Sequence, residues 1–349
     1  MQRFTVAITI LFLANVSLHA ATIHVPADQP TIQAGIDTAS AGDTVLVACG
    51  TYYEHDIVMK SDVCLTGASD QSSCVVIDAQ NDGCGISCDS LTAGTSVEKL
   101  TITNANGGGI RCVVSSSSFK LVTIKNSHSS GFLCINSSPF IQYCTFEENE
   151  GGFGGGMYCI DSSPIIENCK FRNNWIETIG GGMYTQSSII QLNECAFTGN
   201  RAVAGGGLFC DTSIVNIDNC TFVYNRGIEV TGGIHLSESQ ATIINTIVAF
   251  STGGCGVDFD AMVPTLSCSD IYGNQDGDWI GGIADQNGIN GNISSDPLFC
   301  DPDLGDFNLR NDSPCAPENN NCGVLMGAWP VGCSTSAESA TWSDVKALY

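Results

Sequence analysis

The chain has 349 residues, a formal net charge of -24 and 14% charged residues. With 12 Lys and Arg against 36 Asp and Glu, this charge excludes a protein that binds nucleic acid or an anionic membrane surface by electrostatics. The 39 glycines and 43% hydrophobic content exclude a charge-driven disordered chain and favour a β-rich protein with many tight turns.

Residues 1–20 have the pattern of a secretory signal peptide. Arg3 precedes the apolar run 6–16, and Leu18-His19-Ala20 offers a cleavage site. No later segment is long and apolar enough to span a membrane. We therefore expect a protein that is secreted or located at the cell surface. The alternative is an uncleaved anchor helix, which the short apolar run disfavours.

Residues 21–60 are predicted to form an N-terminal cap and the first coil of a repeat structure. Residues 22–25 alternate as a short strand does, Ile32, Ile36 and Ala39 have helical spacing, and residues 44–48 are apolar or β-branched. An amphipathic helix followed by a strand would cover the open end of the first coil.

Residues 61–292 are predicted to form stacked coils, because one pattern recurs every 25 or 26 residues between residues 140 and 250. Each copy holds Cys-x-Phe and an Asn three residues after the Phe, and a glycine run precedes the next short strand. Such a period indicates a solenoid, in which one repeat buries its apolar face only when the next stacks upon it. The predicted interior column contains Ile102, Ile124, Phe146, Phe171, Phe197, Phe222 and Ile247. The Asn residues expected to hydrogen-bond to their own copies are Asn149, Asn174, Asn200 and Asn225.

Three short strands fit into each coil, for example residues 157–160, 165–167 and 169–171. Asn168 and Pro164 suit the corners between them, since Asn tolerates the left-handed conformation and Pro loses no ladder hydrogen bond there. Coils of roughly 22–26 residues predict an all-β fold, a right-handed parallel β-helix with three sheets and an N-terminal helical cap. A leucine-rich horseshoe is disfavoured because its Leu-x-x-Leu-x-Leu signature is missing.

The 19 cysteines form two populations in this exported chain, and their odd number leaves at least one unpaired. Cysteines on the repeats are expected to fill the interior as compact apolar side chains, although strained disulfides between stacked coils are an alternative. Cysteines at the ends are expected to staple the caps, and Cys315–Cys322 is the preferred pair.

Residues 293–333 are predicted to form the last coil and a Cys-rich C-terminal cap, followed by a Ser/Thr-rich tail at 334–349. Two loops near this end offer clustered oxygen ligands for Ca²⁺, the one cofactor that we consider. The candidate ligands are Asp276, Asp278, Asp301, Asp303 and Asp306. Ordinary turn chemistry is the alternative, since neither loop matches a twelve-residue calcium loop.

The strands that follow the glycine runs are predicted to carry a ligand-binding face. One outward column contains Arg111, Leu133, Tyr158, Tyr184, Phe209 and His235, and the next includes Val113, Ile135, Ile160, Gln186, Asp211 and Ser237. Exposed rings stacked at about 4.8 Å suit sugar rings, so we predict a groove that binds a glycan or an extracellular matrix polymer. The alternative is that aromatic residues stack externally for stability alone.

Catalysis has fewer candidate residues. Asp211, His235 and Glu238 on adjoining coils could act in general acid–base chemistry, although a lone outward His is more often simply solvated. The expected protein is a non-catalytic monomer that binds glycan. The alternatives are a polysaccharide lyase or glycoside hydrolase, and a structural spacer or adhesin segment.

Three segments resemble known protein families. TIHVPADQPTIQAGIDTASAGDTVLVACGTYYEH resembles the opening of right-handed β-helix proteins of the pectin-lyase-like superfamily. The repeats SSPIIENCKFRNN…GGGMY resemble those of secreted bacterial β-helix proteins, and DPLFCDPDLGDFNLRNDSPC…GAW is similar to the closing module of surface β-helix proteins with varied C-terminal anchors. The motifs of pectin methylesterases, polygalacturonases and pectate lyases are missing from the sequence. The resemblance therefore implies the fold and no catalytic residue.

Overall fold

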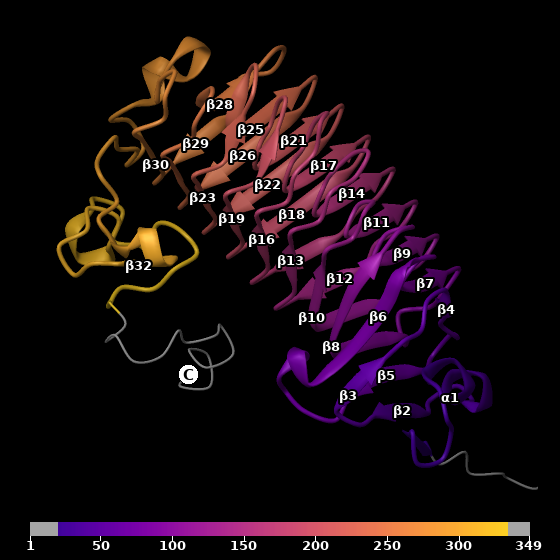
Figure 1. Ribbon diagram of the computed structural model, residues 1–349. Helices are drawn as coiled ribbons and strands as arrows, with labels where there is room; N and C mark the ends of the chain where they lie inside the picture. The colour runs from indigo at the N-terminus through magenta and orange to yellow at the C-terminus, as the bar shows by residue number, and fades with distance from the viewer. Residues whose placement is uncertain (1–19, 334–349) are drawn as a thin grey trace, which may run out of the picture.

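The computed structural model describes residues 20–333, so the predicted signal peptide and the Ser/Thr-rich tail lie outside the described residues. The chain winds into a right-handed parallel β-helix, an elongated prism whose coils stack along one axis (Figure 1). This confirms the fold class predicted from the repeats. No helix among residues 20–333 combines the length and the apolar character that a membrane crossing requires.

One face of the prism, sheet B, is a ladder of short parallel strands. Among residues 20–333 it consists of nine strands: β4 (Ile57–Val58), β7 (Ile86–Asp89), β9 (Ile110–Val113), β11 (Phe132–Ile135), β14 (Met157–Ile160), β17 (Met183–Gln186), β21 (Leu208–Asp211), β25 (Thr231–Ser237) and β28 (Cys255–Phe259). In most of these strands the residues alternate between buried and partly exposed, because successive side chains point into and out of the prism.

The second sheet, sheet A, bends along its length into two flanks. Strand β10 (Ser118–Lys125) pairs with both β12 and β13 of the next coil, so these two strands continue its two halves around a corner. Leu121, at the bend, has a left-handed φ of 55°. The first flank continues through β12 (Phe140–Gln142), β15 (Ile165–Glu167), β18 (Ile189–Asn193), β22 (Ile214–Asp218), β26 (Gln240–Ile244) and β29 (Thr265–Ser267). The second flank continues through β13 (Thr145–Glu147), β16 (Lys170–Arg172), β19 (Ala196–Thr198), β23 (Thr221–Val223), β27 (Ile247–Ala249) and β30 (Asp270–Tyr272).

The earlier coils lead into these flanks. Their strands are β1 (Thr22–Val25), β2 (Thr44–Val47), β3 (Gly50–Tyr52), β5 (Cys64–Gly67), β6 (Val75–Asp82) and β8 (Ser96–Ala105). Helix α1 (Ile32–Thr38) follows β1, and its Ile32 and Ile36 side chains are fully buried against the first coils. The Thr31 side chain accepts a hydrogen bond from the Ala34 N–H and caps the helix. The predicted N-terminal helical cap is thus confirmed.

The interior is filled by the predicted apolar column. The rings of Phe146, Phe171, Phe197 and Phe222 stack with centroids 4.4–4.6 Å apart, and all four are fully buried. The last member of the column was predicted wrongly. Val248, not Ile247, pairs with Phe222, because this coil is one residue longer, and Ile247 faces outward beneath the C-terminal residues.

The predicted Asn ladder runs along a corner of the prism. The Asn149, Asn174 and Asn200 amides each donate to the Oδ1 of the Asn one coil later, at 2.9–3.0 Å. Each of these amides also donates to a carbonyl of the preceding coil, and each Oδ1 that accepts also receives a backbone N–H. The side chains are fully buried, so the ladder satisfies polar groups that burial would otherwise penalise.

Residues near 281–292 close the C-terminal end of the prism. The Ile283 side chain of the 3-10 helix η2 (Gly281–Gln286) is fully buried in the coil core. The Gln286 side chain accepts from the Leu266 N–H and donates to the Pro264 carbonyl, at 2.9 and 2.8 Å. These bonds satisfy backbone polar groups at the open edge of the last coil.

Residues 299–333, predicted as part of the cap, instead form a C-terminal module that lies against the second flank (Figure 1). It contains the antiparallel pair β31 (Phe299–Asp301) and β32 (Asp306–Leu309). Its backbone contacts the flank closely, since a Cβ on Gly327, at φ 92°, would come within 2.7 Å of the Thr221 hydroxyl. The Ala328 N–H donates to that hydroxyl at 2.9 Å.

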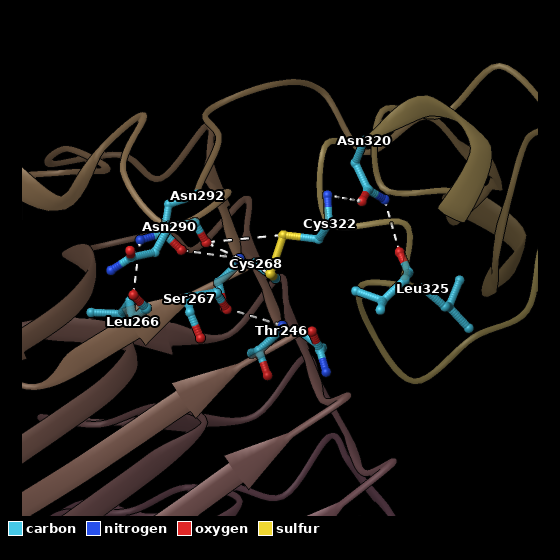
Figure 2. The surroundings of a disulfide bond; sticks show 12 residues. Thr246, Leu266, Ser267, Cys268, Asn290, Asn292, Asn320, Cys322 and Leu325 are labelled. Carbon is cyan, nitrogen blue, oxygen red and sulfur yellow. Dashed lines mark hydrogen bonds between the residues drawn. A yellow bond between two sulfur atoms is a disulfide. The ribbon is translucent and has the colours of Figure 1, made fainter.

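A disulfide between Cys268 and Cys322 ties this module to the coils (Figure 2). The predicted Cys315–Cys322 pair is therefore wrong. Cys315 is free and fully buried, with its thiol 3.2 Å from the Asp270 carboxylate, whereas Cys322 reaches across to the coil. Cys300 pairs with Cys333 within the module, and Cys49 pairs with Cys74 at the N-terminal end. The cysteines on the repeats are free and buried, as predicted.

Candidate functional site

The predicted outward column on sheet B is present in register. Tyr158 pairs with Tyr184, Tyr184 with Phe209, and Phe209 with His235 on successive coils. The ring centroids are 5.1, 5.7 and 4.6 Å apart along this series. The repeat period thus predicted which side chains stack.

The predicted exposure is wrong for two of these rings, Tyr184 and Phe209. Tyr184 is 5% exposed and Phe209 is 9% exposed, because the loops at the third corner fold over them. Ala204 and Ile179 from these loops pack on the rings, and the ring of Phe153 lies 5.6 Å from that of Tyr184. The column is an outer hydrophobic cluster, and its burial raises the pKa of the Tyr184 phenol.

Arg111 lies apart from the rings at the N-terminal end of this column. Leu133 separates it from Tyr158 in the register, and its guanidinium pairs with Asp89 at 2.8 Å. Both partners are well exposed, so this is a surface ion pair. Arg111 therefore does not join the other predicted ligand-binding residues.

The neighbouring outward row is open to solvent. It contains Ile135, Ile160, Gln186, Asp211 and Ser237, which lie in register and are each partly exposed. The Asp211 carboxylate accepts hydrogen bonds from the Tyr184 hydroxyl and the Gln186 amide, at 3.3 and 3.2 Å. The row therefore presents aliphatic side chains at one end and oriented polar groups at the other.

The predicted trio of Asp211, His235 and Glu238 is not assembled. His235 Nδ1 lies 3.2 Å from Asp258 Oδ2 on the next coil and 3.3 Å from the Thr231 hydroxyl. Glu238 contributes its backbone N–H, which donates to Asp260 at 2.8 Å. Asp258 was missed because the strict period ends near residue 250. Asp258 could have been found if the next coil had been taken as shorter than 25 residues, because that spacing places Asp258 beside His235.

The His235–Asp258 pair is well positioned. A bulge in β25 between Thr231 and Ile234 directs the Thr231 hydroxyl toward both partners. The hydrogen bond from His235 is the main reason that the pKa of Asp258 is lowered. The carboxylate can therefore orient the imidazole.

The predicted Ca²⁺ ligands are dispersed into turns. The Asp278 carboxylate accepts from the Gly273 and Asn274 N–H groups, and Asp301 caps a short 3-10 helix through Leu304. The Asp306 carboxylate accepts from the Asn308 N–H. Within residues 20–333 no group of three or more His, Cys, Asp or Glu side chains could hold a metal ion. The five predicted aspartates, Asp276 and Asp303 included, therefore do not form a calcium site among the described residues.

A second site, the second-flank cleft, was not predicted. It has a volume of ≈ 380 Å³ and lies between three coils of the second flank and the C-terminal module. Its main side chains are Lys170, Arg172, Tyr224, Asp303, Phe307 and Trp329. No linear pattern could indicate it, because one wall comes from residues 170–224 and the other from residues 302–329.

Comparison with known proteins supports the fold. Residues 113–259 match the family described as "Right handed beta helix region", which confirms the resemblance seen in the repeats. No curated protein matches the chain. Among similar solved structures, pectate lyase Pel9A is 12% identical over 89% of this chain and 96% of its own, with a TM-score of 0.47.

Two further solved structures are similar. The Azotobacter vinelandii mannuronan C-5 epimerase AlgE4 A-module is 17% identical over 70% of this chain and 73% of its own, with a TM-score of 0.39. ORF18 of Geobacillus virus E2 is 15% identical over 65% of this chain, with a TM-score of 0.42. The chain spans about half the length of ORF18, 52%. Identities this low assign no activity.

Proposed function

We propose that this protein is a secreted or cell-surface β-helix that binds a linear glycan or matrix polymer along the open row of sheet B. The supporting observation is the alignment of partly exposed side chains, from Ile135 to Ser237, on consecutive coils. A polymer lying along the prism would meet one such side chain at each coil, about every 4.8 Å. Aliphatic groups suit the apolar faces of sugar rings, and Gln186 and Asp211 suit their hydroxyls.

The buried aromatic column has a structural role in this proposal. Tyr184 orients Asp211 through its hydroxyl, and Tyr158 and Phe153 retain exposed ring surface at the border of the row. The disulfides support an extracellular location, because such bonds persist mainly in oxidising compartments.

Electrophoresis through gels that contain soluble polysaccharides tests the proposal. The variant Gln186→Ala/Asp211→Ala is expected to lose retardation, with about a tenfold weaker apparent affinity for the polymer that retards the wild type. Asn216→Ala is the matched control, since Asn216 is exposed on the first flank. Equal retardation of the wild type and the double variant would contradict binding along this row. No retardation by any polymer would favour the spacer or adhesin role.

The His235–Asp258–Thr231 cluster favours a second candidate function, polysaccharide cleavage. An imidazole oriented by a carboxylate is suited to proton transfer, and His235 adjoins the open row. The test is incubation with acidic and neutral polysaccharides, scored for new unsaturated or reducing ends. Products that form with the wild type and are lost in His235→Asn would favour an enzyme. If no such products form, the His235–Asp258–Thr231 cluster would have a structural role only.

A further inference from the structure

The second-flank cleft combines three aromatic rings with a concentration of positive charge that is rare in this chain. Two of the 12 Lys and Arg residues, Lys170 and Arg172, line it together. The Lys170 ammonium lies 5.0 Å from the centre of the Trp329 ring, and the centre of that ring is 6.0 Å from the centre of the Phe307 ring. The Tyr224 ring completes the aromatic lining, 6.3 Å from that of Phe307.

The charges in the cleft are arranged asymmetrically. Arg172 is paired with Glu147, whose carboxylate lies 3.0 Å from its guanidinium. Among the described lining residues the single carboxylate is Asp303, which belongs to the module. Burial, and next to it the charge of Asp303, raise the pKa of Tyr224. The cleft therefore has a cationic end at Lys170 and Arg172 and an acidic end near Asp303 and Tyr224.

At the cationic end, the Lys170 side chain is largely enclosed and lies beside a second cation, Arg172. Burial and the neighbouring Arg172 lower the pKa of Lys170 to about 7, and Glu147 offsets this only in part. A carboxylate that entered the cleft could form charge-assisted hydrogen bonds with the ammonium.

We propose that this cleft binds a small hydroxylated ring compound with one carboxylate, and that Lys170 and Arg172 receive that carboxylate. The ring would lie among Trp329, Phe307 and Tyr224, and its hydroxyls would donate to Asp303. The volume of ≈ 380 Å³ is within the range of small-ligand sites. A sugar acid and a hydroxylated aromatic acid share this chemistry. The inference is independent of polymer binding on sheet B, because the cleft lies on another face.

Calorimetric titration of the full protein with glucuronate and with 4-hydroxybenzoate tests the inference and distinguishes the two sources. We expect at least one of them to bind with a millimolar Kd, and the neutral analogues glucose and phenol to bind at least about tenfold more weakly. Between one pH unit below and one above the Lys170 pKa of about 7, the protonated fraction falls about tenfold, and the affinity should fall with it. The other charged groups that act on Lys170 are Arg172 and Glu147.

The variant Lys170→Met retains the aliphatic stem and removes the ammonium. This variant is expected to bind the acid at least about tenfold more weakly than the wild type does, and its affinity should no longer depend on pH. Lys120→Met is the matched control, because Lys120 is exposed on another part of sheet A, and it should bind as the wild type does.

Thermal unfolding separates lost binding from misfolding. The folded-state pKa of Lys170 lies below its usual value of 10.5, so the buried charge destabilises the fold most below about pH 7. Lys170→Met should therefore raise the midpoint there. The inference is overturned if neither acid binds at about 10 mM, if the neutral analogues bind equally well, or if Lys170→Met binds as the wild type does.

Discussion

The outer face of sheet B and the second-flank cleft both gather aromatic rings outside the prism, yet they differ in how the rings meet. On sheet B the rings of Tyr158, Tyr184 and Phe209 come from equivalent positions of successive coils, and they pack on one another. In the cleft, Tyr224 comes from a coil whereas Phe307 and Trp329 come from the module, and a void remains between the two walls. Rings at equivalent positions of successive coils therefore pack tightly. Where the C-terminal module meets the second flank, the two surfaces do not repeat each other, and a cavity remains between them.

The largest effect is expected from cutting the tether that holds the second wall of the cleft. Cys268 and Cys322 are 54 residues apart, so loss of this loop closure in Cys268→Ala/Cys322→Ala should cost about 4 kcal/mol. Amide exchange should then accelerate in the C-terminal module while the sheet B strands stay protected. Hydrogen–deuterium exchange measures both regions in one experiment.

Cys49→Ala/Cys74→Ala is the control for this prediction, since that disulfide lies at the N-terminal end, 25 residues apart in sequence. It should leave the exchange of the module unchanged. Unchanged protection of the module in Cys268→Ala/Cys322→Ala would show that packing alone holds the wall of the cleft in place.

A somewhat smaller effect is expected within the sheet B column. Phe209→Ala should lower the free energy of unfolding by about 3 kcal/mol, because the ring is 9% exposed and contacts rings on both sides. Phe153→Ala, whose ring is 43% exposed, should cost less than about 1 kcal/mol. Urea denaturation compares the two. Similar losses would mean that the column is not a packed cluster.

The smallest effect concerns the contact between the module and the last coils. Burial raises the pKa of the fully buried Asp270 to about 7, above its usual 3.8, although it accepts hydrogen bonds from the Ser295 N–H and the Cys315 thiol. Folding stability should therefore fall as the pH rises from about 4 to about 7, since only the unfolded state ionises freely there.

Asp270→Asn should flatten this part of the pH profile and stabilise the protein by about 1 kcal/mol above pH 7, because its amide still accepts from Ser295. Thermal unfolding across this pH range is the measurement. A profile as steep as that of the wild type would assign the pH dependence to another group.

The parts of the structure that repeat could be predicted from the sequence, and the parts that do not repeat could not. The Phe stack, the Asn ladder and the register of the sheet B column follow from a period of 25 or 26 residues. The covering of Tyr184 and Phe209 depends on corner loops that differ in sequence between coils, so the period carried no information about it. Ile247 was misplaced for a related reason, a single extra residue in one coil.

The candidate site was predicted less well than the fold. The partner of His235 is Asp258, on a coil that departs from the period. The partner of Cys322 and the whole second-flank cleft depend on where a module without repeats docks. That docking is determined by apolar contacts such as those of Ile247 and Phe299, which have no signature in the order of residues along the chain.

The Asn ladder has a consequence for how this molecule changes length. Each middle Asn, such as Asn174, accepts two bonds from the Asn of the coil before it and donates two to the Asn of the coil after it. If the DNA for one complete coil is deleted or duplicated, the coils on either side can therefore form the same hydrogen bonds with each other. The β-helix then becomes shorter or longer by about 4.8 Å. Related proteins can accordingly differ in the length of the β-helix while they keep the same N-terminal cap and C-terminal module.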